Sequence, residues 1–462
     1  MNNKKEYLLI ASIILLGLGM ALMMSATNGT WRNTSFADYS DDSDTYNRTA
    51  MLLVERFSFH DESSLYVGMQ RRSPGYPVFL AFLYFFFGKA PAAVFAAQGL
   101  LYAASIFLLW KLARLYLTRP YSFLPPFLLA AAWPVALFVT KLETELLSLF
   151  LLLAYIFLTE TFFLGQKRKF LRLVGAGAAL ASFILIKPAT LYLVPPIVIF
   201  LALRARPPHL SVQKTLAAFL AFPVILIGGW TVRSIIVFDT WQIQSGSFVV
   251  GYRGLEVTGS WDRATAAFLG GLLGDIVAGK FFPGYARDPE PYPSIDAITT
   301  QFVILGKEGL REAEREKIIY REAYDRILQN PLKFALYGIT GLLRQNTPMN
   351  LEGHAMTHTF AGGEYDYLSE IEKIAILLAI RLTWYFFLAM VLYGAWKHMR
   401  HWESWGIIFI FVFGYNLLYA FFTHNEARYM VPLFPSYFLL FTAALFFLQS
   451  GRQSSLRESA SD

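Results

Sequence analysis

The chain has 462 residues, of which 55% are hydrophobic and only 16% are charged. Ordinary soluble domains have roughly a quarter of their residues charged, so the composition argues against a soluble enzyme and predicts a helical membrane protein. A net charge of +7 is then typical of basic cytoplasmic loops rather than of nucleic-acid binding. The sequence contains no Cys, which excludes disulfides and thiolate chemistry.

About ten apolar stretches have roughly the length needed to cross a hydrocarbon core of about 30 Å. Lys4 and Lys5 precede the first stretch, which is longer than the apolar part of a signal peptide and therefore predicts an uncleaved span. The spans are expected at residues 7–25, 91–110, 121–139, 146–163, 173–186, 190–203, 216–230, 371–395, 405–422 and 429–448. The apolar stretch 75–88, of about 14 residues, predicts an interfacial or re-entrant helix. The stretch 331–343 predicts a helix at the interface.

The positions of Lys and Arg predict which side of the membrane each loop faces. Basic loops follow the second, fourth, sixth and eighth spans, so these loops and both termini are expected in the cytoplasm of a cell with the protein in its inner (plasma) membrane. The long polar segments are then expected on the periplasmic or outer face. The predicted units are an N-terminal transmembrane module (1–231) with an acidic first outer loop (26–90), an outer-face cap (232–370), C-terminal transmembrane helices (371–450) and a cytoplasmic tail (451–462).

The first outer loop has four carboxylates within seven residues, at Asp38, Asp41, Asp42 and Asp44. A group this dense is either solvated or shares a cation or a proton. A helical apolar pattern begins at Tyr46, and Asp42 or Ser43 would cap that helix. The sequence alone leaves these interpretations open.

Arg71 and Arg72 lie next to the apolar stretch 75–88, at the expected outer interface. Two guanidinium groups at such a position are suited to an anionic headgroup or a lipid phosphate, although snorkelling of long side chains to the interface would place them similarly.

Six short motifs occur in a fixed order. They are Asp42-x-x-x-Tyr46-x-x-x-Ala50, Ser73-Pro-Gly-Tyr-Pro77 before an apolar helix that ends in Phe87-Gly88, Thr140-Lys-Leu-Glu-Thr-Glu145-Leu, Lys187-Pro188, Trp230-Thr-Val-Arg233-Ser, and Asn425-Glu426-Ala-Arg428-Tyr429-x-x-Pro432-x-x-Pro435. Together they resemble the GT-C glycosyltransferases, in the branch of the protein O-mannosyltransferases and lipid A aminoarabinose transferases. The resemblance covers roughly residues 38–435 but leaves out 248–368. It departs from the family pattern at Asp42-Ser43, where many relatives have Asp-Glu, and at Ser234, where Asn is usual.

The resemblance implies an all-α, polytopic GT-C bundle with interfacial helices and an outer cap. It also implies an inverting transfer of a sugar from a polyprenyl-phosphate donor to a glycolipid, polysaccharide or protein acceptor. Such a reaction needs a base for the acceptor hydroxyl and cations for the leaving phosphate. Asp42 is the expected base, with Asp44 as the alternative, and Glu145 is expected to orient the acceptor, to pair with a cation or to be a solvated first-turn residue.

Under this resemblance, the cations expected to bind the donor phosphate are Arg71, Arg72, Lys187, Arg233 and Arg428. Tyr46, Tyr76 and Tyr429 are expected to position the substrate. A divalent cation on the Asp cluster is possible in principle, but no zinc-type spacing is present among the histidines. The expected partners are the lipid donor, the acceptor and membrane lipids, and not nucleic acid.

Three other functions remain open on the sequence. An O-antigen ligase or polymerase would use the later outer loop, so the acidic first loop would be dispensable. A transporter or flippase for lipid-linked sugars would have polar or charged residues in mid-span, and these spans have few. A scaffold without activity would tolerate replacement of the Asp cluster by Asn.

Overall fold

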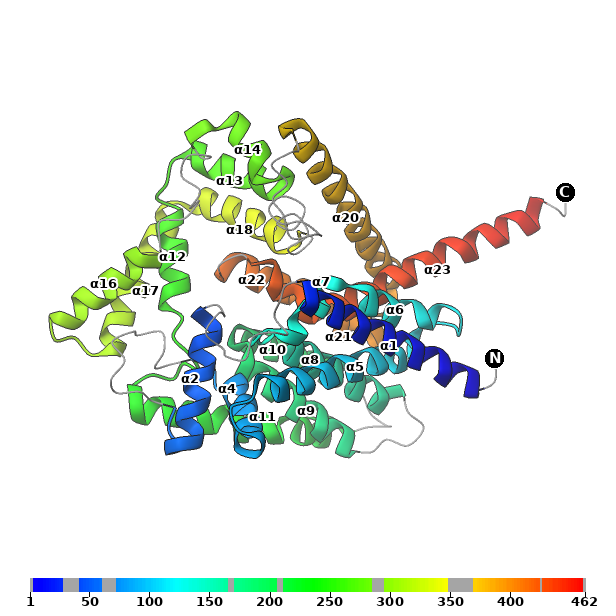
Figure 1. Cartoon of the computed structure of the whole chain (residues 1–462), viewed down its shortest axis with the longest axis horizontal. Helices are drawn as coiled ribbons and strands as arrows, with labels where there is room; N and C mark the ends of the chain where they lie inside the picture. Colours follow the sequence, from blue (N-terminus) through cyan, green and yellow to red (C-terminus); the bar gives the residue numbers. More distant parts are fainter. Residues whose placement is uncertain are drawn as a thin grey trace.

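The computed structural model of the chain is a bundle of helices (Figure 1). It describes residues 3–27, 41–59, 72–164, 170–205, 211–284, 295–347, 369–423 and 426–459, and these residues form no strand. The all-α, polytopic class predicted from the composition is therefore confirmed.

The helices of the N-terminal half follow one another in chain order. They are α1 (Asn3–Thr27), α2 (Asp41–Arg56), α4 (Gly75–Phe87), α5 (Pro91–Tyr116), α6 (Leu124–Ala131), α7 (Trp133–Ala136), α8 (Glu145–Leu164), α9 (Phe170–Ile186), α10 (Val194–Arg204) and α11 (Val212–Phe238). Short 3₁₀ segments join some of them, namely η2 (Tyr121–Phe123), η3 (Leu137–Thr140) and η4 (Pro188–Leu193).

The helices α12 to α18 form a layer beside the bundle, which we call the cap (Figure 1). The cap consists of α12 (Ser247–Glu256), α13 (Trp261–Leu273), α14 (Asp275–Phe281), α16 (Ile295–Lys307), α17 (Glu312–Gln329) and α18 (Pro331–Gln345). The chain then returns to the bundle with α20 (Glu370–His398), η5 (Met399–His401), α21 (Trp402–Phe409), the π-helix η6 (Ile410–Tyr415), α22 (Asn416–Phe422), η7 (Ala427–Leu433) and α23 (Phe434–Ser459).

Six helical stretches of the described residues are long and apolar enough to cross a membrane: Asn3–Ala26, Pro91–Tyr116, Glu145–Leu164, Val212–Phe238, Ile371–Phe422 and Ala427–Gln449. A seventh arises if Tyr121–Ala131 and Trp133–Thr140, which meet at 54°, form one broken span. The shorter apolar helices Phe170–Ile186 and Pro188–Arg204 lie at two further predicted positions. Each of the ten predicted stretches is thus helical, and Gly75–Phe87 is a short apolar helix, as expected.

The break between α6 and α7 has a local cause in the sequence. Pro134 lacks an N–H, and its ring would clash with the carbonyl of Ala130 in a continuous helix. Ala132 accordingly leaves the helical conformation, at φ −74° and ψ 79°. After the bend, η3 leads directly into the segment 141–145, which contains Glu143 and Glu145.

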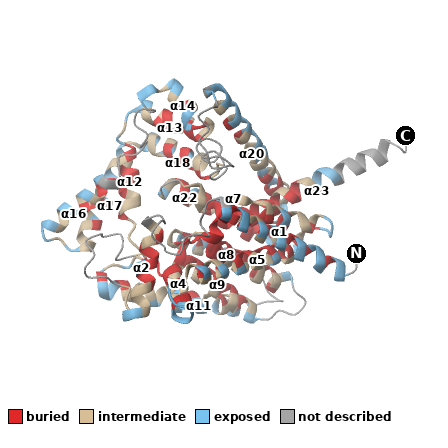
Figure 2. Ribbon diagram, in the orientation of Figure 1, coloured by how far each residue is buried: buried red, intermediate tan, exposed pale blue. Residues whose placement is uncertain are grey.

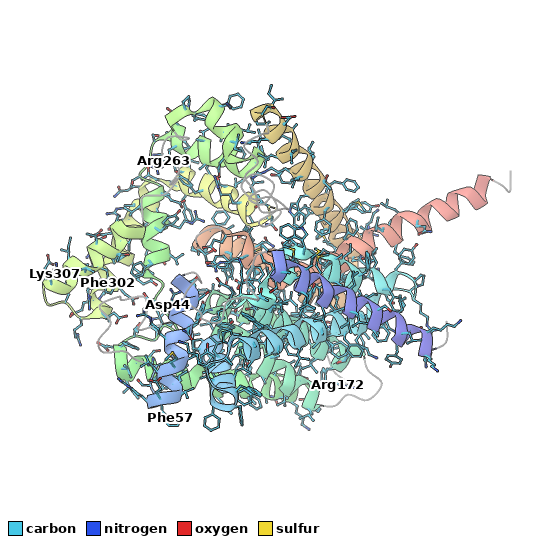
Figure 3. The ribbon with its side chains drawn as sticks, in the orientation of Figure 1. Asp44, Phe57, Arg172, Arg263, Phe302 and Lys307 are labelled. Atoms are coloured by element: carbon cyan, nitrogen blue, oxygen red, sulfur yellow. The ribbon has the colours of Figure 1, made fainter. Side chains whose placement is uncertain are left out.

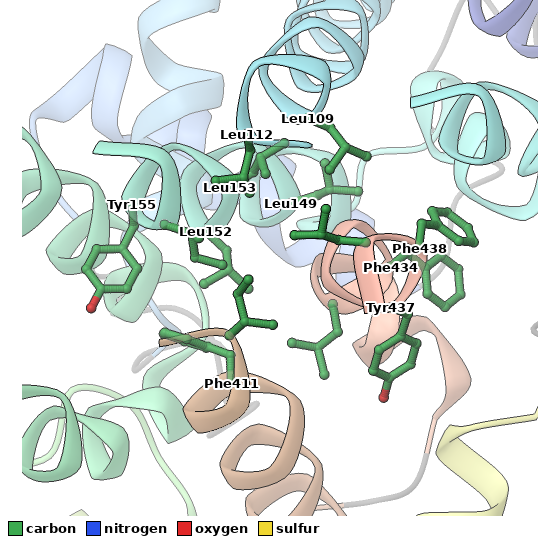
Figure 4. Packing of buried hydrophobic residues seen from close by; sticks show 14 of the residues in the cluster. Leu109, Leu112, Leu149, Leu152, Leu153, Tyr155, Phe411, Phe434, Tyr437 and Phe438 are labelled. Atoms are coloured by element: carbon green, nitrogen blue, oxygen red, sulfur yellow. The ribbon is translucent and has the colours of Figure 1, made fainter. Parts of the chain in front are cut away.

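The largest core lies where α5, α8 and α9 meet α21 to α23, and Figure 2 shows buried residues concentrated there. Aliphatic side chains of α5 and α8 face aromatic rings of the C-terminal helices (Figure 4), among them Leu109, Leu112, Leu149, Leu152, Phe411, Phe434 and Phe438. Between membrane spans such packing holds helices together by close van der Waals contact, so small residues at the crossings are important.

Gly177 lies at such a crossing of α9 and α11. A Cβ atom there would be 2.0 Å from the carbonyl oxygen of Phe219, which is backbone that cannot move aside easily. We expect Gly177→Ala to lower the free energy of unfolding by about 1–3 kcal/mol, measured as thermal unfolding in detergent. Gly228 of α11 is the matched control, because a Cβ atom there has no atom within 4 Å. Equal melting temperatures for the two variants would contradict this packing.

Two buried arginines join the cap to the bundle. Arg253 of α12 donates to the carbonyl oxygens of Ala420 (2.6 Å) and Thr423 (2.7 Å) at the end of α22. Arg381 of α20 donates to the carbonyl oxygen of Gly271 (2.5 Å) at the end of α13. The last carbonyls of a helix have no partner within the helix, so each arginine caps a helix of the other layer.

Candidate active site

Asp42 lies in the first turn of α2 and contacts two arginines from distant parts of the chain. Its Oδ1 is 2.9 Å from Nη1 of Arg72, just before α4, and its Oδ2 is 2.7 Å from Nη2 of Arg428, in η7. Arg72 also contacts an aromatic ring, because its guanidinium group lies 5.8 Å from the centre of the Tyr46 ring. Burial raises the pKa of the Tyr46 hydroxyl further above its ordinary value, so this ring stays neutral.

Arg428 pairs with three carboxylates through three different nitrogens. Nη2 binds Asp42, Nη1 lies 2.7 Å from Oε2 of Glu143, and Nε donates to Glu426. Glu143 is almost fully buried, with 8% of its side chain exposed. A buried carboxylate needs a charged or hydrogen-bonding partner, and Arg428 supplies it.

A second buried ion pair lies beside the first group. Lys187 at the end of α9 is 3.2 Å from Oε1 of Glu145, the first residue of α8, and the two side chains are 8% and 1% exposed. A carboxylate at a helix N-terminus and an ammonium group after a helix C-terminus each oppose the partial charge of the helix end. The Lys187 ammonium also lies 4.9 Å from the centre of the Tyr429 ring, next to Arg428.

These contacts bring four carboxylates and three cations to one end of the spans. We call them the charge cluster, and its members are Asp42, Arg72, Glu143, Glu145, Lys187, Glu426 and Arg428. Burial lowers the pKa of the neighbouring Lys141 below its ordinary value, although Glu143 opposes this shift.

Buried hydrogen bonds fix the segment that carries Glu143 and Glu145. The amide nitrogen of Gln98 lies within 2.9–3.3 Å of the carbonyl oxygens of Phe138, Val139 and Lys141. The hydroxyl of Tyr76 donates to Oε1 of Gln98 (3.0 Å). Tyr76 is fully buried, so it acts on the acidic segment through Gln98.

Two serines connect the remaining pieces of the cluster. Ser43, next to Asp42, donates to the carbonyl oxygen of Leu142 (3.0 Å), next to Glu143. Ser73, next to Arg72, donates to the carbonyl oxygen of Ile186 (3.2 Å), next to Lys187. These two hydrogen bonds link residues adjacent in sequence to the charged ones. They therefore fix Asp42 relative to Glu143, and Arg72 relative to Lys187.

Some predicted site residues lie elsewhere. Asp44 pairs with Arg48 at 2.8 Å on a half-exposed face of α2, at the end opposite to Phe57 (Figure 3). Arg233 lies over aromatic rings, 4.5 Å from the centre of Trp230 and 5.6 Å from that of Phe59. Arg71, Asp38 and the three outer-loop histidines, His354, His358 and His424, lie outside the described residues, as does the side chain of Asp41.

Two members of the cluster were given no role from the sequence. Glu143 and Glu426 both belong to recognised motifs, two residues from Glu145 and from Arg428 respectively. The signal for Glu143 is the second acidic residue in its motif, and the signal for Glu426 is a carboxylate two residues from Arg428. Only the tertiary structure makes both of them partners of Arg428.

The described residues contain no group of three or more His, Asp or Glu side chains arranged to hold a metal ion. A hollow of about 350 Å³ lies in the cap, between the start of α13 and the residues after α14. Its lining shares no residue with the charge cluster, and includes Ser260, Asp262, Arg263, Phe281 and Phe282.

Known proteins share parts of this sequence and its fold. Residues 71–230, about a third of the chain, match the family described as dolichyl-phosphate-mannose-protein mannosyltransferase. A crystal structure of the Archaeoglobus fulgidus oligosaccharyltransferase tethered with an acceptor peptide superposes with a TM-score of 0.50 and 14% identity, over 96% of this chain and 50% of that chain. The fold is that of a GT-C glycosyltransferase. The family match confirms the predicted resemblance to the protein O-mannosyltransferase branch.

Two further solved structures are similar to the chain over most of its length. AglB of A. fulgidus, in complex with an inhibitory peptide and a dolichol-phosphate, has a TM-score of 0.48 and 12% identity, over 99% of this chain and 52% of that chain. ArnT of Cupriavidus metallidurans, bound to undecaprenyl phosphate, has a TM-score of 0.37 and 12% identity, over 96% and 78%. The chain spans about half the length of the two archaeal proteins. No protein of curated function matches it in sequence.

Proposed function

We propose that the chain is an integral membrane glycosyltransferase that moves a sugar from a polyprenyl-phosphate donor to a glycolipid, polysaccharide or protein acceptor on the outer face of the membrane. The observation that carries this proposal is the charge cluster. At one end of the spans, Asp42 in the first turn of α2 pairs with Arg72 and Arg428, and Glu145 in the first turn of α8 pairs with Lys187. The family matched by residues 71–230 is named for a lipid-phosphate-linked sugar, which supports a donor of this class.

Asp42 is the proposed general base. As the acceptor hydroxyl oxygen attacks the anomeric carbon, its proton moves to a carboxylate oxygen of Asp42. The bond from the anomeric carbon to the phosphate oxygen breaks, and its electron pair goes to the lipid phosphate. Attack opposite to the leaving group inverts the configuration at the anomeric carbon.

Arg72, Lys187 and Arg428 are the proposed phosphate-binding cations. The departing lipid monophosphate gains negative charge, and guanidinium groups fixed in advance stabilise such charge in the transition state. Glu145 holds Lys187 in place (3.2 Å), which favours a pairing role for Glu145 over direct contact with the acceptor. Tyr46 and Tyr429 flank Arg72 and Lys187 with their rings and so position the cations.

The purified protein in lipid vesicles, supplied with radiolabelled monosaccharides on undecaprenyl or dolichyl phosphate and an envelope extract as acceptor, tests this function. We expect label in the extract together with an equal amount of free lipid monophosphate for at least one donor. A transporter would instead move the intact donor to the other leaflet without release of lipid phosphate. Intact donor throughout, with an active reference glycosyltransferase in parallel, would contradict the proposal.

A further inference from the structure

Both carboxylate oxygens of Asp42 are engaged by cations. Oδ1 lies 2.9 Å from Arg72 and Oδ2 lies 2.7 Å from Arg428. Two charge-assisted hydrogen bonds stabilise the ionised carboxylate and make it a poorer proton acceptor. In this arrangement Asp42 is bound to the same groups that are suited to a phosphate.

The way in which Arg428 is held allows one of its bonds to change while the others stay. Nη1 binds Glu143 and Nε binds Glu426, so two carboxylates hold the guanidinium plane without Asp42. The remaining Nη2 faces Asp42. A guanidinium group has separate donors in a rigid fork, so Nη2 can accept a new anion with little movement of the side chain.

We infer that the donor phosphate exchanges with Asp42 on Arg72 and Arg428, so that Asp42 becomes an effective base only after the donor has bound. This inference rests on the proposed function and adds to it an order of binding: donor first, acceptor second. The phosphate oxygens take the two guanidinium bonds, and the released carboxylate then accepts the proton of the acceptor hydroxyl as the new glycosidic bond forms. Lipid monophosphate leaves with the electron pair of the broken bond.

The exchange gives Glu143 and Glu426 a defined role as positioning residues. Neither contacts the donor in this scheme, but both keep Arg428 in place while its third bond changes partner. Glu143 is the more deeply buried of the two, with side chains 8% and 39% exposed. Its removal should therefore weaken phosphate binding, which is the opposite of the effect expected at Asp42.

The test is the affinity of the full-length protein in detergent for undecaprenyl phosphate, measured by a fluorescence titration. Asp42 competes with the phosphate for two cations, so Asp42→Asn should bind about three- to tenfold more tightly than the wild type. Asp42→Ser removes the same charge and should show the same gain in affinity. It replaces Asp42→Asn in the test if that variant does not fold. Asp44→Asn is the matched control for net charge, since Asp44 lies two residues from Asp42 but pairs with Arg48. It should change the affinity less than twofold. Glu143→Gln should bind more weakly.

The outcomes separate this inference from the proposed function. If Asp42→Asn and Asp42→Ser bind the lipid phosphate as the wild type does or less tightly, Asp42 orients the arginines and does not compete, and the exchange is wrong even if the protein transfers sugar. An equal gain in Asp44→Asn would show a general charge effect and would also overturn the exchange. If the folded wild type does not bind undecaprenyl phosphate, the exchange fails, while the vesicle assay decides on the proposed function independently.

Discussion

Asp42→Asn should reduce the turnover number for sugar transfer about 10³-fold, because an amide cannot take the proton of the acceptor hydroxyl and general bases contribute factors of about 10²–10⁴. The substitution keeps the shape of the side chain, so the melting temperature should stay close to that of the wild type. The measurement is the initial rate of sugar transfer in vesicles at saturating donor, with protein amounts matched by immunoblot.

Asp44→Asn is the control for this experiment, because Asp44 carries the same charge on the same helix and pairs with Arg48 on a half-exposed face. It should retain most of the activity. Loss of activity in Asp44→Asn alone would move the base by two residues. Full activity in both variants would favour the ligase hypothesis, in which catalysis depends on the later outer segment.

Arg428→Gln should have the second-largest effect, with a turnover number lowered about 10²- to 10³-fold, because the developing charge on the lipid phosphate loses a fixed donor. The same substitution leaves the buried Glu143 without its guanidinium partner. Removing one partner of a buried ion pair is destabilising, so we expect a loss of about 2 kcal/mol in unfolding free energy, about the cost of an uncompensated buried polar group.

A second substitution separates these two effects of Arg428. Glu143→Gln added to Arg428→Gln removes the carboxylate charge that has lost its guanidinium partner, so the double variant should recover stability but not activity. Arg48→Gln is the surface control, since its pair with Asp44 is exposed and such pairs contribute about 0–1 kcal/mol. If the double variant regained sugar transfer, Arg428 would be a structural residue and not a phosphate-binding one. Thermal unfolding in detergent and the vesicle assay give the two readouts.

The fold could be predicted because its main signals are local. Apolar stretches locate the spans, and the short length of Gly75–Phe87 marks a non-spanning helix. The break within the predicted span 121–139 was not predicted, although Pro134 is its local cause. The candidate site was only partly predictable. Asp42, Lys187 and Arg428 follow from motifs, but no local pattern says that residues 386 positions apart, Asp42 and Arg428, form an ion pair.

The placement of Asp44 and Arg233 shows the limit of reading residues from motifs. Two residues along a helix correspond to a rotation of about 200°, so Asp42 and Asp44 face different sides of α2 although they are close in sequence. Arg233 is at the end of a span, where a cation can bind a phosphate or stack on rings, and the choice depends on Phe59 from another segment. Such choices are made by tertiary contacts.

Under the proposed function, the reciprocal capping of cap and bundle by Arg253 and Arg381 would limit how an acceptor reaches the charge cluster. If the cap moved away from the bundle, the carbonyl oxygens of Gly271, Ala420 and Thr423 would lose the hydrogen bonds that the two arginines donate. Each carbonyl group left buried without a donor would cost about 1–3 kcal/mol. A long glycan or a protein segment is therefore expected to approach along the edge of the cap, which would serve as a fixed wall that selects acceptors by their width.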